Sequence, residues 1–133
     1  MTLKLSISHL SVDNPEQALA FYRDVLGLKL VGDVAQGELR WLTLASPDQP
    51  DVKLVLSQPH AGRTQEDGDA MARLLAKGTL GGVIFNSSNL DATFEKLRAA
   101  GADIVQAPTD QPWGVRDCAV RDPAGNMIRI NQA

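Results

Sequence analysis

Only a few side chains in this sequence could carry out acid–base, nucleophilic or metal chemistry. There are two histidines, His9 and His60, and one cysteine, Cys118. A single cysteine excludes an internal disulfide and a cysteine-cluster zinc site, and in an apolar run it is better explained as a small strand residue than as a nucleophile. The sequence also lacks a glycine-rich phosphate loop and a nucleophile elbow. Any chemistry must therefore come from isolated polar groups that the fold brings together.

The charges of the chain are scattered rather than clustered. Thirteen Lys and Arg residues are mixed with sixteen Asp and Glu residues, for a net charge of −3, and no basic run marks a surface for nucleic acid. The first residues alternate between polar and apolar types, unlike a secretory signal, and no apolar run approaches the roughly 20 residues of a membrane span. We therefore expect one globular domain in the cytoplasm, with neither nucleic acid nor membrane as a partner.

The first half of the chain predicts one strand, one helix and three further strands. Residues 3–12 alternate as a strand does, and Asn14-Pro15 then supplies a helix N-cap followed by proline at the first helical position. Apolar residues recur at three- and four-residue steps up to Gly27, which fits a left-handed C-terminal cap. Three strand-like runs follow, separated by turn-forming residues, at 28–34, 38–45 and 51–58. This order is βαβββ.

The second half repeats that order after a connection. The connection, residues 59–79, begins with a polar stretch and ends with a run, residues 69–78, that can form a short helix. A strand, a helix and three strands are then predicted at 81–88, 89–101, 102–108, 114–122 and 126–132. We therefore divide the single domain, residues 1–133, into a first module (1–58), the connection (59–79) and a second module (80–133).

A fixed offset of 74 residues relates the two halves. It superposes LGLKL (26–30) on AGADI (100–104), and it also superposes KLVLS (53–57) on MIRIN (127–131). Two separate anchors with one offset favour a duplicated βαβββ unit over a chance alternation of helices and strands.

Ahead of the helices the register slips by one residue. Asn14 to Gly27 is thirteen steps, whereas Asn89 to Gly101 is twelve. We interpret this slip as a short deletion in an otherwise regular repeat.

Three segments of the chain resemble one known superfamily. AFYRDVLGLKL (20–30) resembles the FY…LG motif that ends its first helix, RDPAGNMIRI (121–130) resembles its closing DP.GN.IE motif, and LDATFEKLRAAGADIV (90–105) resembles its second-module helix. This is the glyoxalase/bleomycin-resistance/extradiol-dioxygenase, or vicinal oxygen chelate, superfamily. The resemblance implies an α+β fold in which each module curls a mixed sheet of four strands into half of a cup. It also implies a small-molecule site between the halves and a homodimer.

The resemblance further implies a divalent metal, held by His and by Glu or Gln on the first and last strands of each module. The corresponding positions here are Ile7 and Gly82 or Val83 on the first strands, and Val55 and Arg129 on the last. Apolar residues offer no donor atoms, and a guanidinium repels a cation. We therefore predict no metal and no other cofactor.

His9 is the one potential metal ligand near those positions. It lies two residues after Ile7 and so faces the same side of the strand. One imidazole does not make a metal site, and a histidine in the cup wall that makes a hydrogen bond is the simpler explanation. His60 lies in the polar connection, where we expect it to be solvated.

Strand alternation separates residues that would face the cup from residues that would face the helices. If Val55 and Arg129 face the cup, so do Lys53, Ser57, Met127 and Asn131, whereas Leu54, Leu56, Ile128 and Ile130 face the helices. By the same rule Trp41 and Thr43 face the cup, and Leu42 and Leu44 do not. The predicted ligand-binding residues are Ile7, His9, Trp41, Thr43, Val55, Trp113, Met127, Arg129 and Asn131.

Two of these residues have a second explanation. Arg129 could bind a ligand carboxylate or phosphate, or it could form an internal salt bridge, for instance to Asp117. Trp113, which precedes Gly114 just before a strand, could stack on a flat ligand at the pocket mouth, or it could cover the core or a dimer contact. Apolar walls with a few polar anchors are typical of small-molecule sites.

Three functions are compatible with these residues. The first, favoured by the unsuitable ligand positions, is a metal-independent protein that binds a small aromatic or amphipathic compound, similar to the bleomycin-resistance branch. The second is a metal-dependent lyase, isomerase or dioxygenase of the same superfamily, which His9 keeps open but whose catalytic residues the sequence does not identify. The third is a protein-interaction module, for which the sequence offers no positive sign.

Overall fold

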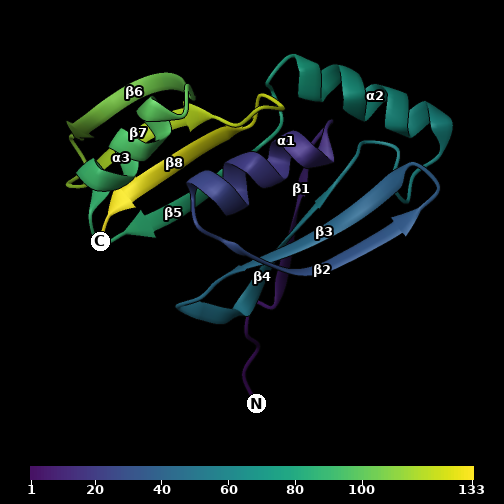
Figure 1. Ribbon diagram of the computed structural model, residues 1–133, viewed down its shortest axis with the longest axis horizontal. Helices are drawn as coiled ribbons and strands as arrows, with labels where there is room; N and C mark the ends of the chain where they lie inside the picture. The colour runs from purple at the N-terminus through teal and green to yellow at the C-terminus, as the bar shows by residue number, and fades with distance from the viewer.

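The computed structural model in Figure 1 describes residues 1–133. The protein is built from two four-stranded mixed sheets. The first sheet has the order β1-β4-β3-β2 and contains β1 (Ile7–Ser11), β2 (Lys29–Gln36), β3 (Leu39–Ser46) and β4 (Gln49–Ser57). The second has the order β5-β8-β7-β6 and contains β5 (Val83–Ser87), β6 (Asp103–Asp110), β7 (Arg116–Arg121) and β8 (Met127–Gln132). In each sheet the first strand runs parallel to the last, and the other pairs are antiparallel. The predicted α+β fold of two βαβββ modules is confirmed.

Asparagine begins the helix of each module and glycine ends it. The side chain of Asn14 accepts a hydrogen bond from the backbone N–H of Gln17, and that of Asn89 accepts one from Ala92, both at 3.1 Å. Gly27 and Gly101 follow the helices with φ angles of +80° and +79°, a conformation that favours glycine. The helices between these caps are α1 (Pro15–Leu19), which continues as the π-helical segment η1 (Ala20–Val25), and α3 (Leu90–Ala99).

The π-helical segment accounts for the one-residue slip between the modules. The N–H of Leu26 donates to the carbonyl of Phe21, five residues back, at 3.0 Å. Bonds of this kind widen a helix and accommodate one extra residue. At the end of α3 the N–H of Ala100 instead donates to Lys96, four residues back, also at 3.0 Å. The first helix therefore places thirteen residue steps between its asparagine and glycine caps, whereas the second places twelve.

One face of each sheet is buried under the helices. The strand residues on this face are at most 1% exposed where the sheets are best covered, at Leu42, Leu44, Leu56, Ile128 and Ile130. They form one core cluster with Phe21 and Tyr22 of η1 and with Leu90 and Leu97 of α3. The strand alternation expected from the sequence is therefore confirmed for the buried side.

The turn between β7 and β8 joins the two modules. The Tyr22 hydroxyl donates to Asp122 Oδ2 at 2.5 Å, and Asn126 Nδ2 donates to the Ser11 carbonyl at 2.7 Å. Asp122 Oδ1 also accepts hydrogen bonds from the backbone N–H groups of Ala124 and Asn126. Burial, reinforced by the neighbouring Asp122 carboxylate, raises the pKa of the Tyr22 phenol. The DP.GN segment is therefore both a turn and the joint between modules.

The first strand is shorter than the sequence predicts. β1 begins at Ile7 rather than at residue 3, because β4 pairs with it only from Lys53 to Ser57. Residues 1–6 project from the first sheet, as the purple N-terminus in Figure 1 shows, and Leu3 and Leu5 are exposed. None of the helices combines the length and the apolar composition that a membrane-spanning helix needs.

The connection contains a longer helix than predicted. α2 (Gln65–Ala76) begins before residue 69, because the hydroxyl of Thr64 caps it by accepting from the N–H of Asp67 at 3.2 Å. The prediction that His60 is merely solvated is wrong. Its Nε2 lies 2.8 Å from Asp69 Oδ1, and its ring packs so closely on Gly68 that no side chain would fit there.

Candidate functional site

The face of each sheet opposite the buried core carries most of the predicted ligand-binding residues, and we call these two surfaces the open faces. On the first open face, Val55 in β4 lies between His9 in β1 and Thr43 in β3. Trp41 is two residues from Thr43 and pairs with Ser57. Ile7, which is 48% exposed, is two residues from His9. The structure therefore brings Ile7, His9, Trp41, Thr43 and Val55 onto one surface.

The second open face carries Met127, Arg129 and Asn131, and its polar groups are bonded to one another. Arg129 Nη1 lies 3.1 Å from Asp117 Oδ2, so the internal salt bridge is the alternative that the structure contains. Asp117 is only 2% exposed and also accepts a hydrogen bond from Gln111 Nε2 at 2.8 Å. The same amide donates to Gln106 Oε1 at 2.9 Å. This network leaves few unbonded polar groups on the second open face.

The two open faces do not enclose a common cavity within the chain. His9 and Trp41 line one cavity beside β1, and a different cavity of about 660 Å³ lies between the β3–β4 turn and β5, where Ile84 and Asn86 line it. The remaining seven predicted residues line none of the three main cavities, which leaves their role a prediction. Trp113, in the β6–β7 loop, is 67% exposed.

The cavity beside β1, which we call the β1 cavity, has a volume of about 310 Å³. It lies between the first open face and the connection that follows β4. Trp41 and His9 form part of its wall, and Met71 of α2 and Leu80 add apolar surface. Its other lining residues are Leu10, Ser11, Ser57, Ala61, Arg63, Gly81 and Asn126. The cavity therefore combines an aromatic wall with several polar groups.

Two polar residues of the β1 cavity were missed by the sequence prediction. Arg63 belongs to the connection, and its Nη1 donates to the Pro59 carbonyl at 3.1 Å. Asn126 donates from Nδ2 to Ser11 and to Asp122, but its buried Oδ1 accepts no hydrogen bond from the protein. Asn126 stood in the recognised turn motif, which could have indicated a role beyond the turn. Nothing in the sequence around Arg63 shows that the connection folds back against β1.

The residues at the metal positions do not fit a divalent ion. Ile7 and Val55 have no donor atoms, and Arg129 is a cation already paired with Asp117. Gly82 lies against the backbone of Met127, where an added Cβ would be only 1.7 Å from the carbonyl oxygen. That position therefore has no room for a ligating side chain. No group of three or more His, Cys, Asp or Glu side chains in the structure could hold a metal.

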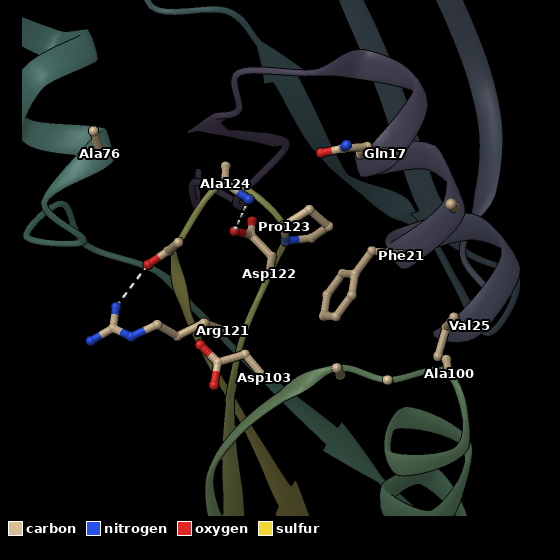
Figure 2. Close-up of a pocket in the computed structure, with 14 residues that line it drawn as sticks. Gln17, Phe21, Val25, Ala76, Ala100, Asp103, Arg121, Asp122, Pro123 and Ala124 are labelled. Atoms are coloured by element: carbon tan, nitrogen blue, oxygen red, sulfur yellow. Dashed lines mark hydrogen bonds between the residues drawn. The ribbon is translucent and has the colours of Figure 1, made fainter.

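A groove of about 680 Å³ lies elsewhere, between η1 and the β7–β8 turn. Figure 2 shows Phe21 and Val25 on one side of it, Pro123 and Ala124 on the other, and Asp103 at its edge. Its strongest polar groups are already bonded. Asp122 accepts from Tyr22, and Arg121 Nη1 donates to the Gly125 carbonyl at 2.7 Å. Because few polar groups point into this groove without a partner, the β1 cavity is the better candidate site.

Three known proteins are similar to this chain over nearly its whole length. The solved structure of UcmS2 is 35% identical, with a TM-score of 0.86 and 100% of each chain covered. TnmS3, described as an antibiotic binding protein from Streptomyces sp. CB03234, is 25% identical, with a TM-score of 0.75 and coverage of 98% of this chain and 95% of TnmS3. The uncharacterized protein YurT of Bacillus subtilis (strain 168) is 27% identical over 130 residues, which cover 98% of this chain and 99% of YurT.

A family model gives the same assignment as the fold. It is described as the Glyoxalase/Bleomycin resistance protein/Dioxygenase superfamily and matches residues 5–130. The matched range contains both βαβββ modules, the paired helix caps and the turn that joins the modules. The chain therefore belongs to the glyoxalase/bleomycin resistance protein/dioxygenase superfamily.

Proposed function

We propose that this protein binds a small aromatic or amphipathic compound in the β1 cavity without the help of a metal. The observation that carries the proposal is the wall formed by Trp41 and His9 in a cavity of about 310 Å³. This volume is at the small end of the roughly 300–1,000 Å³ of ligand pockets. An indole offers a flat apolar surface on which an aromatic ring can stack. The similarity to TnmS3, described as antibiotic binding, supports a ligand of this kind.

The remaining predicted residues form the outer part of the proposed site. Ile7, Thr43 and Val55 continue the first open face beyond the cavity, and Met127, Arg129 and Asn131 form the second. Apolar groups on both faces are exposed, with Ile7 at 48% and Ile84 at 64%. We expect a homodimer in the cytoplasm to cover these groups, with Trp113 at the rim, and sedimentation of the purified protein tests its oligomeric state.

Tryptophan fluorescence tests the binding proposal directly, because the chain has only two tryptophans. In Trp113→Phe, Trp41 is the only tryptophan that remains. Titration with a panel of aromatic antibiotics and metabolites should identify a compound that quenches Trp41 saturably and also raises the melting temperature. Trp41→Phe should show a smaller rise in melting temperature with that compound, because phenylalanine offers a smaller stacking surface and binds it more weakly.

Metal analysis separates this function from a metal-dependent lyase, isomerase or dioxygenase. Protein purified without chelators should bind the compound equally well before and after treatment with EDTA. A stoichiometric divalent ion that is lost in His9→Ala, together with loss of binding after chelation, would contradict a metal-independent site. A panel that quenches nothing and shifts no melting temperature would also count against the proposal.

A further inference from the structure

We propose that the ligand of the β1 cavity is an aromatic anion whose negatively charged group binds Arg63. This inference rests on the proposed function and specifies the ligand's chemistry. Arg63 is the only Lys or Arg that lines the cavity, and no Asp or Glu lines it. A guanidinium beside an aromatic wall is suited to a flat ring that carries a carboxylate, sulfonate or similar group.

Arg63 differs from most arginines of this protein in having no acidic partner. Other arginines are neutralised by carboxylates within the chain, namely Arg23, Arg40, Arg98, Arg116 and Arg129. The guanidinium of Arg63 makes one hydrogen bond, from Nη1 to the neutral carbonyl of Pro59. Its other N–H groups remain available, so an anion in the cavity would meet a positive charge that the protein does not itself compensate.

The backbone around Arg63 is held in place by local hydrogen bonds. The N–H of Ala61 donates to Gln58 at 3.0 Å, and the N–H of Arg63 donates to His60 at 3.2 Å. Gly62 has a φ angle of +71°, which permits the tight turn between them. Thr64 follows as the N-cap of α2. A guanidinium on an ordered turn loses less conformational entropy on binding than one on a flexible loop.

The first sheet supplies the aromatic contact of the cavity. Trp41 in β3 and His9 in β1 line it, and the hydroxyl groups of Ser11 and Ser57 add neutral hydrogen-bonding groups. Met71 and Leu80 add apolar surface to the cavity, and the flexible methionine side chain can adapt to the shape of a ligand. The ring system of a ligand would therefore lie against Trp41 while its anionic group reaches toward the connection.

A pair of fluorescent probes that differ by one charge tests this inference. Anilinonaphthalene sulfonate is an aromatic anion, and N-phenylnaphthylamine has the same ring system without the sulfonate. Probe fluorescence reports binding, and weaker binding of both probes to Trp41→Ala shows that they occupy the β1 cavity. We expect Arg63→Ala to weaken binding of the anionic probe by about tenfold at low salt, because one charge-assisted hydrogen bond is lost. The affinity of the neutral probe should change by less than about twofold.

Arg73→Ala is the matched control. Arg73 lies in α2, is exposed as Arg63 is, forms no salt bridge and does not line the cavity, so its loss changes the net charge equally. It should leave both affinities within about twofold, since its charge does not line the cavity and acts on a bound probe only through solvent that screens it. Arg63→Lys should keep part of the preference for the anion, and circular dichroism confirms that each variant is folded.

The outcomes separate this inference from the proposed function. Equal weakening of the anion by Arg63→Ala and Arg73→Ala would mean that only net charge matters, which would overturn the role of Arg63. If Arg63→Ala weakens the binding of both probes equally, Arg63 contributes only apolar surface to the cavity. That result would also overturn its proposed role. If the neutral probe binds the wild type and Arg63→Ala changes the affinity of neither probe, this inference alone fails. If neither probe binds the wild type, or if both bind Trp41→Ala as tightly as the wild type, the proposed function fails as well.

Discussion

The two modules share their helix caps and strand order, yet their open faces use polar residues in opposite ways. In the second module Arg129 is neutralised by Asp117, which Gln111 holds in turn. The position 74 residues earlier is Val55, which has no charge to neutralise. The first module instead presents Trp41 and His9 to a cavity. The comparison indicates that polar groups of the second open face stabilise their own sheet, whereas those of the first are available for a ligand.

The helices differ as well, and this difference concerns how the modules are joined. The first helix contains an extra residue and the π-helical segment η1, whereas α3 is a regular α-helix. Phe21 and Tyr22 lie on η1, and Tyr22 reaches Asp122 in the second module. The equivalent turn of the first module, around Asp48, is exposed. The two modules therefore differ at the place where they are joined by the hydrogen bond between Tyr22 and Asp122.

Removal of the joint should have the largest effect on stability. Asp122 is 4% exposed and accepts hydrogen bonds from Tyr22, Asn126 and Ala124. Asp122→Ala should lower the free energy of unfolding by about 4 kcal/mol, because it leaves the buried Tyr22 hydroxyl and the buried backbone N–H of Asn126 without an acceptor. Urea denaturation measures the change. Asp48→Ala, at the corresponding exposed position of the first module, should cost less than about 0.5 kcal/mol. Similar losses in the two variants would contradict the asymmetry.

Deletion of Asp24 makes the first helix as long as the second and tests the role of the extra residue. One residue rotates a helix by about 100°, so Phe21 and Tyr22 would no longer point as they do relative to Gly27. We expect a loss of about 3 kcal/mol in urea denaturation, since a buried aromatic pair is displaced. Asp24→Ala keeps the helix length and removes only an exposed ion pair with Arg23, so it should be nearly neutral. A neutral deletion would show that the π-helical turn does not position Tyr22.

The sequence predicted the fold because each of its elements has a local or periodic cause. Asn14 caps its helix as predicted, Asn89 caps the second helix in the same way, and the strand alternation that buries Leu56 and Ile128 is confirmed. The 74-residue offset required only that both copies keep the same number of residues between the end of the helix and the last strand. The π-helical turn could not be predicted in this way, because one widened turn leaves the apolar spacing on either side unchanged.

The candidate site was only partly predictable for a similar reason. Alternation placed His9 and Trp41 on the same face, and both line the β1 cavity. Arg63 and Met71 reach that cavity from the connection, whose path depends on long-range packing rather than on any local pattern. The sequence named Asp117 as one possible partner of Arg129, but it could not decide between that salt bridge and a ligand, because both need the same inward-facing guanidinium.

Alkaline unfolding tests whether Tyr22 is buried at the joint. Its phenol pKa is raised above the ordinary value of about 10 by burial and by Asp122. The contribution of the protonated Tyr22 phenol to the free energy of unfolding is complete below that ordinary pKa. It is lost as pH rises above it, because the unfolded chain then loses a proton that the folded chain keeps. Wild-type stability should fall by about 1.4 kcal/mol per pH unit more steeply than that of Tyr22→Phe above about pH 10. Parallel profiles in urea denaturation would mean that Tyr22 ionises freely in the folded protein.

The smallest effect concerns Cys118, whose labelling reports how firmly the second sheet is closed. The thiol is fully buried in β7, and burial raises its pKa, as does Asp117, while Arg129 lowers it. Arg129→Ala leaves Asp117 with Gln111 as its remaining side-chain partner and should destabilise the sheet by about 1 kcal/mol. Labelling with a thiol reagent should then be about fivefold faster if it requires the sheet to open, because the open fraction rises by that factor.

The sign of the change distinguishes two routes of labelling. If the reagent reached Cys118 in the closed sheet, loss of Arg129 would remove a positive neighbour, raise the thiol pKa further and slow the reaction. Acceleration therefore assigns a stabilising role to the Arg129–Asp117 pair. Lys53→Ala is the matched control, since it removes one cation from the first open face at a position that makes only a hydrogen bond to Pro50. Its labelling rate should stay within about twofold of wild type, because Lys53 lies in the first sheet and its side chain does not bond to Asp117 or Arg129.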